Sequence, residues 1–152
     1  FVIAFSAVFS FATRRSDTLL AAQLTVDHMK CFRFESPVFA GNAADVESSL
    51  ATRYGWNVRI PPSSAADGVE LVGARRCLYA DGAIPHILYR VHGRNVSLYL
   101  LPGVSRSAAQ VVALGHESRI WSRGDTTYVL VLPEDGRAEM TAAARYVMRE
   151  VH

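Results

Sequence analysis

Apolar residues recur at helical spacing in three parts of the chain. Between residues 13 and 34, Leu20, Leu24 and Phe32 fall near one helical face, which predicts a helix there. The segment 42–54 has a capping residue at each end, because it begins with Asn42 and Gly55 follows it. The last segment, 136–150, again places its apolar residues on one side of a helix.

Between residues 69 and 132 the apolar positions alternate with polar ones, which is typical of strands. Asp81-Gly82 is a strong signal for a two-residue hairpin loop, and a second hairpin is expected near Gly93. The short segment 56–62 also has the composition of a strand. We therefore predict an α+β fold with a mostly antiparallel sheet of about five to seven strands. Helices 42–54 and 136–150 are expected to cover one face of it.

The first twelve residues, FVIAFSAVFSFA, contain no charged side chain. Because a membrane-spanning helix needs about 20 apolar residues, we interpret residues 1–13 as the C-terminal part of a transmembrane helix that begins before Phe1. A buried core helix is the alternative. The interpretation divides the chain into this transmembrane part, a stalk helix and linker at 14–40, and an α+β domain at 41–152, which the resemblance described below implies is extracytoplasmic.

The composition argues against several classes of function. The chain has 152 residues, of which 50% are hydrophobic, and this is enough for one domain with an apolar core. The formal net charge is only +2 and the basic residues are scattered, so we expect no nucleic-acid partner. The segment GVSRS lacks the second glycine of a nucleophile elbow. We therefore expect no enzyme, no catalytic residues and no small-molecule substrate.

Both cysteines of the chain can be placed beside a histidine. His28 and Cys31 are three residues apart on a predicted helix and share one face of it. If the predicted two-residue loop is correct, Cys77 and His86 pair across the hairpin, with Cβ atoms about 5 Å apart. Two thiolates and two imidazoles suit a tetrahedral metal ion. The sequence therefore predicts a metal site at His28, Cys31, Cys77 and His86, provided that the helix docks beside the hairpin.

A disulfide or simple burial would also account for the two cysteines. In an oxidising compartment Cys31 and Cys77 would form a disulfide, and an extracytoplasmic location slightly favours this over a metal site. Alternatively, both cysteines are packed in the core without a chemical role, since cysteine is among the residues most often buried.

Two stretches, LTVDHMKCF at 24–32 and LVGARRCLYADGAIPHILYRVHGRNVSLYLLPG at 71–103, resemble the extracytoplasmic part of membrane-anchored bacterial anti-sigma factors. GWNVRIP at 55–61 and GHESRIWSRGDTTYVLV at 115–131 are similar to this family as well. The resemblance extends over nearly all of the chain after residue 20. Such proteins combine a cytoplasmic sigma-binding module, often zinc-binding, with one transmembrane helix and a periplasmic domain.

The resemblance implies a single-pass protein of the bacterial inner membrane with its C-terminal domain in the periplasm. Residues 1–15 would contact membrane lipid, and a region before Phe1 would bind a sigma factor. The domain would then sense an envelope, redox or metal signal. The alternative is a single-pass accessory subunit that binds membrane-protein partners of a larger complex through an exposed apolar surface.

Overall fold

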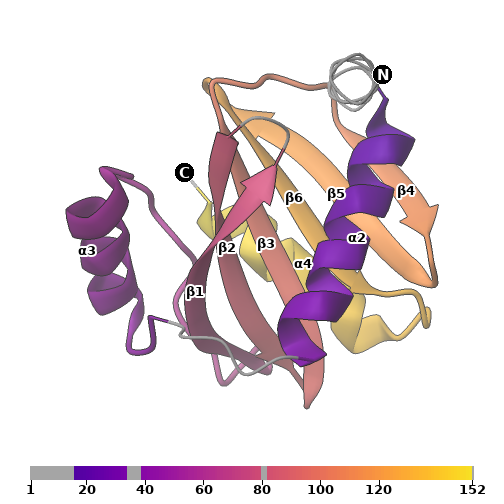
Figure 1. The fold of residues 1–152 in the computed structure, drawn as a ribbon. Helices are drawn as coiled ribbons and strands as arrows, with labels where there is room; N and C mark the ends of the chain where they lie inside the picture. The colour runs from indigo at the N-terminus through magenta and orange to yellow at the C-terminus, as the bar shows by residue number, and fades with distance from the viewer. Residues whose placement is uncertain (1–15, 34–38, 80–81, 152) are drawn as a thin grey trace.

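The computed structural model describes residues 16–33, 39–79 and 82–151, which form three helices and six strands. The elements are shown in Figure 1 and are, in chain order, α2 (Asp17–Arg33), α3 (Ala43–Tyr54), β1 (Val69–Tyr79), β2 (Gly82–Val91), β3 (Arg94–Pro102), β4 (Ala109–Ala113), β5 (His116–Arg123), β6 (Thr126–Pro133) and α4 (Ala138–Glu150). The α+β class is therefore confirmed. The predicted transmembrane part at 1–13 lies outside the described residues, and none of the described helices is long and apolar enough to cross a membrane.

The six strands form one sheet in the order β1-β2-β3-β6-β5-β4, and every neighbouring pair is antiparallel. Each half of the sheet is a meander of three strands that are consecutive in sequence. The two meanders join where β3 pairs with β6 at the centre. The antiparallel sheet and the hairpin at Gly93 are thus as the sequence predicts.

Helices cover both faces of the sheet, so the core has two layers. Helices α3 and α4 contribute to the apolar cluster on one face, with α4 across the sheet and α3 beside β1 (Figure 1). Helix α2 packs on the opposite face, where Leu20 and Leu24 join a second cluster that includes Tyr99 and Val129. The segment predicted as a stalk therefore contains a helix that is part of the packed domain.

The hairpin between β1 and β2 has a different register from the predicted one. The prediction pairs Cys77 with His86, whereas the structure pairs Cys77 with Ile84 and Arg75 with His86. The two registers differ by a shift of two residues, and side chains alternate with a period of two. The shift therefore leaves every side chain on its expected face, and the hydrophobic pattern alone does not distinguish the two registers.

A β-bulge divides β1 into two parts whose side chains alternate in opposite senses. Leu71 pairs with Tyr89 and Gly73 pairs with Leu88, so Val72 is an extra residue without an opposite partner. Gly73 adopts a φ of 150° there, which favours glycine. The extra residue inverts the alternation, so Leu71 faces α4, whereas Cys77 faces α2.

The capping prediction for α3 is confirmed, and the predicted strand at 56–62 is wrong. The side chain of Asn42 accepts a hydrogen bond from the Asp45 amide at 3.0 Å, and Gly55 ends the helix with a φ of 70°. Residues 56–62 form no strand. The Ile60 amide instead donates to the Glu47 carboxylate at 2.9 Å, and the two prolines that follow have no amide hydrogen for a ladder.

Candidate functional site

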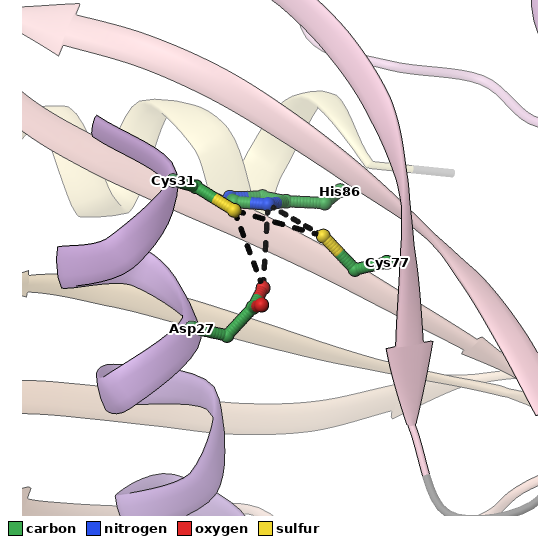
Figure 2. A group of neighbouring side chains, drawn as sticks. All are labelled: Asp27, Cys31, Cys77 and His86. Atoms are coloured by element: carbon green, nitrogen blue, oxygen red, sulfur yellow. Dashed lines mark hydrogen bonds and ion pairs between the residues drawn. The ribbon is translucent and has the colours of Figure 1, made fainter. Parts of the chain in front are cut away.

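Four potential metal ligands meet where α2 crosses the first hairpin. Asp27 and Cys31 are four residues apart on α2, and this spacing places both on one helical face. Cys77 comes from β1 and His86 from β2, where they are diagonal neighbours on the face that α2 covers. Figure 2 shows the four side chains pointing toward one another. One ligand atom from each lies within 4.8 Å of every other.

The individual distances describe a compact polyhedron. The two sulfur atoms are 3.9 Å apart, and Cys77 Sγ lies 3.2 Å from His86 Nδ1. Asp27 Oδ2 lies 3.7 Å from Cys31 Sγ and 3.6 Å from His86 Nδ1. A tetrahedral ion with metal–sulfur bonds of about 2.3 Å and metal–nitrogen or metal–oxygen bonds of about 2.1 Å separates its ligands by about 3.4–3.8 Å. These four distances match four of the six edges of such a tetrahedron to within about 0.4 Å, and the other two edges are no longer than 4.8 Å.

Three of the four predicted residues belong to this compact group: Cys31, Cys77 and His86. The fourth, His28, does not contribute a ligand atom to it. The Nδ1 atom of His28 is hydrogen-bonded to Ser97 Oγ at 2.7 Å, and its ring packs against His116 with centroids 5.0 Å apart. The fourth member of the compact group is instead Asp27, the residue directly before it.

Ser97 connects the two buried histidines. Its Oγ lies 2.7 Å from His86 Nε2 and 2.7 Å from His28 Nδ1. The single hydroxyl proton can be donated to only one of the two rings, so the other ring must donate to Ser97. A metal ion on His86 Nδ1 requires the proton of His86 on Nε2, which then donates to Ser97. Ser97 in turn donates to His28.

Tyr99 contacts two members of the cluster, His86 and Asp27. Its ring stacks on His86 with centroids 4.1 Å apart and an interplanar angle of 22°. Its hydroxyl lies 3.1 Å from both Asp27 Oδ2 and the Leu24 carbonyl oxygen. Tyr99 therefore contacts the face of the imidazole and hydrogen-bonds the carboxylate, and both groups are oriented before any ligand binds.

Burial keeps both histidines of this network neutral. Burial and then the nearby His116 lower the pKa of His28 from 6.5 to about 4. Burial lowers the pKa of His86 well below its ordinary value, and the charges of His28 and Arg75 act in the same direction. Each ring therefore has one unprotonated nitrogen at neutral pH, and at His86 this is the form that binds metal ions.

The two thiols have opposite tendencies to ionise. The hydrogen bond with Cys77 lowers the pKa of Cys31 to about 7, and Arg75 also favours its thiolate. The same hydrogen bond and burial raise the pKa of Cys77, because the Cys77 proton is held between the sulfurs. Cys31 is therefore the thiol that ionises first. Cys31 is half-buried and Cys77 is buried.

The disulfide favoured slightly by the sequence is not formed in this structure, because both cysteines are free and their sulfurs are 3.9 Å apart. Sequence reasoning missed Asp27, Ser97 and Tyr99 as members of the site. For Asp27 a signal exists, since it precedes Cys31 by four residues and so shares its helical face. Ser97 and Tyr99 belong to a strand whose register with the hairpin only the folded chain determines.

Comparison with known proteins gives no match: no family model matches the sequence, and neither a curated protein nor a solved structure is significantly similar to it. The functional argument therefore rests on the geometry of this site.

Proposed function

We propose that this chain is the metal-sensing, extracytoplasmic domain of a membrane-anchored regulator of the anti-sigma-factor type. The observation that carries the proposal is the compact set of ligand atoms from Asp27, Cys31, Cys77 and His86, which all lie within 4.8 Å of one another. Two sulfurs, a nitrogen and an oxygen suit Zn²⁺ and similar late first-row ions. Mg²⁺ and Ca²⁺ prefer sites built from oxygen alone, so they are poor candidates.

The surroundings of the cluster support an ion with two positive charges. Two thiolates, one carboxylate and a neutral imidazole carry three negative charges, so a divalent ion leaves the site with one. Arg75 lies on the same face of β1 as Cys77, is 9% exposed and favours the Cys31 thiolate. Its positive charge offsets the remaining negative charge, which lowers the cost of burying the loaded site.

An ion at this position would couple ligand binding to the placement of α2. Two of the ligands belong to α2 and two to the hairpin, so the ion would bridge the helix and the sheet. Helix α2 is about 25 Å long and begins at Asp17, shortly after residues 1–15, for which we propose contact with membrane lipid. An ion at about 100 times its Kd stabilises the docked helix by about 2.7 kcal/mol. This amounts to about a hundredfold shift in a two-state equilibrium.

Cobalt titration of the purified full chain tests the site. We expect one Co²⁺ per chain, with a thiolate-to-metal charge-transfer band, tetrahedral visible bands and displacement by Zn²⁺. Cys77→Ser and His86→Asn should weaken binding by more than roughly 100-fold, because each removes a direct ligand. The matched control is His92→Asn, since His92 is exposed in the β2–β3 turn and its φ of 46° is one that asparagine tolerates.

Hydrogen exchange then tests the coupling to the helix. Metal should slow amide exchange in α2 and leave α3 unchanged, because α3 packs at β1 and contributes no ligand. Equal cobalt affinity in His86→Asn and His92→Asn would refute the site. Metal binding without added protection of α2 would refute the sensing mechanism and leave the site intact.

One observation favours the alternative function as an accessory subunit. Leu19, Val26 and Met29 are 38%, 51% and 42% exposed and lie along the outer side of α2, which suits contact with a helix of a partner. In that case Val26→Glu should dissociate a larger complex in native gels while cobalt binding stays unchanged. Dissociation of this kind would favour the subunit over the sensor.

A further inference from the structure

We propose that Cys31 and Cys77 are a peroxide-reactive pair, in which a hydroperoxide oxidises Cys31 and Cys77 then closes a disulfide with it. Three observations support the assignment of roles. The sulfur atoms are 3.9 Å apart, Cys31 is half-buried, and Cys77 is only 7% exposed. A peroxide that arrives from solvent therefore reaches Cys31 first. This activity goes beyond metal sensing, because it requires only the metal-free thiols.

The first step oxidises Cys31 to a sulfenic acid. The thiol proton moves to Asp27, whose Oδ2 accepts the hydrogen bond from Cys31 Sγ at 3.7 Å. The sulfur attacks one peroxide oxygen, so a sulfur–oxygen bond forms and the oxygen–oxygen bond breaks. Sulfur loses two electrons to the peroxide, and the leaving oxygen takes the proton from Asp27 and departs as water or an alcohol.

The second step forms the disulfide and releases a water molecule. His86 Nδ1 lies 3.2 Å from Cys77 Sγ and can take the thiol proton as Cys77 attacks the Cys31 sulfur. The sulfur–sulfur bond forms and the sulfur–oxygen bond breaks. The departing hydroxide takes the proton from His86, so Asp27 and His86 both return to their starting states.

The geometry permits this closure with a local movement. A disulfide bond is about 2.0 Å long, so the sulfurs must approach by about 1.9 Å. Cys31 lies in the last turn of α2, where a helix can adjust without disturbing its buried first turns. The disulfide would link residues 46 positions apart and attach α2 to β1 covalently. It would also remove two ligands from the metal site, so oxidation and metal binding exclude each other.

Thiol counting on the EDTA-treated full chain tests the proposal. One equivalent of hydrogen peroxide should remove both thiols, lower the intact mass by two hydrogens and leave the protein monomeric under non-reducing conditions. Dithiothreitol should restore both thiols. Because no metal is present in this assay, its outcome is independent of whether the chain binds metal ions.

The order of attack is tested with two variants and dimedone, which traps sulfenic acids. Cys77→Ser should accumulate a trapped sulfenic acid on Cys31, and Cys31→Ser should react at least roughly tenfold more slowly, because Cys77 is buried. Two free thiols in peroxide-treated wild type would overturn the proposal, as would trapping mainly on Cys77. The wild-type result decides the question even if a variant fails to fold, since it uses no substitution.

Discussion

Replacing His28 by asparagine should remove a pH-dependent part of the stability of the fold. His28 is 4% exposed and lies on the side of α2 that packs on the sheet, where it contacts Ser97 and His116. The asparagine amide can occupy the position of Nδ1 and keep a hydrogen bond to Ser97, but it does not titrate. The substitution therefore separates the effect of protonation from the loss of the hydrogen bond.

The size of the effect follows from the pKa of His28, which is about 4 in the folded protein and 6.5 in the unfolded chain. Between these values the unfolded chain binds a proton that the folded protein does not bind, so the free energy of unfolding decreases as the pH falls. Each pKa unit corresponds to about 1.4 kcal/mol, so wild type should lose about 3 kcal/mol between pH 7.5 and pH 4 through this residue.

Urea unfolding of metal-free wild type and His28→Asn at a series of pH values measures this difference. Both proteins keep His86 and the same carboxylates, so these contributions largely cancel. Above pH 7 the difference between the two free energies of unfolding should not change with pH. Between pH 7 and pH 4 the free energy of unfolding of wild type should fall by about 3 kcal/mol more than that of the variant. Parallel curves over the whole range would show that His28 is not held neutral by burial.

Two further predictions concern the anchoring of α2 and the state of its thiol. Leu24 in α2 and Leu50 in α3 are 2% and 0% exposed, so replacing either by alanine should cost about 2–5 kcal/mol in urea unfolding. Only Leu24→Ala should also weaken cobalt binding, and an equal effect of both variants would contradict the anchoring argument. In metal-free protein, the rate at which iodoacetamide alkylates Cys31 should reach half its maximum near pH 7, because its pKa is lowered to about 7 by the hydrogen bond with Cys77. Peptide mass spectrometry would follow this reaction, and a half-maximum near pH 9 would show that the thiol is not activated.

The sequence predicts this fold well where the signal is local. Asn42 and Gly55 bound α3 through hydrogen bonds and backbone angles that depend on only a few neighbouring residues. The strands also follow from alternation, although β2 and β3 each contain six consecutive buried residues because helices cover both faces. The prediction of a strand at 56–62 failed because of tertiary contacts. The apolar residues of this segment pack against the core without strand pairing, and the Ile60 amide donates its hydrogen bond to the carboxylate of Glu47 on α3.

The candidate site could be predicted only in part, because its members come from elements that are far apart in sequence. Helical spacing brings Asp27, His28 and Cys31 to the same part of α2, but spacing does not mark which of them is a ligand. Which of them can act as a ligand depends on β3, because this strand lies beside β2 and places Ser97 within hydrogen-bond distance of His28. The Nδ1 atom of His28 is therefore hydrogen-bonded to the Ser97 hydroxyl, and Asp27 is the α2 residue that joins Cys31 in the ligand group.

The bulge in β1 shows how a single residue lets one strand contribute to both layers of the core. If Val72 had a partner, the alternation would continue unbroken from Cys77 back to Leu71, and Leu71 would face α2 rather than α4. Leu71 would then be lost from the apolar cluster under α3 and α4, whereas Cys77 and His86 would still share a face, because their register is set between the bulge and the hairpin loop. The period-two pattern of the sequence contains no sign of this inversion, because each face of β1 carries both apolar and charged residues. Gly73, with its φ of 150°, is the local feature that allows the bulge, and it thereby lets Leu71 pack under α3 and α4 while Cys77 meets His86 on the face that α2 covers.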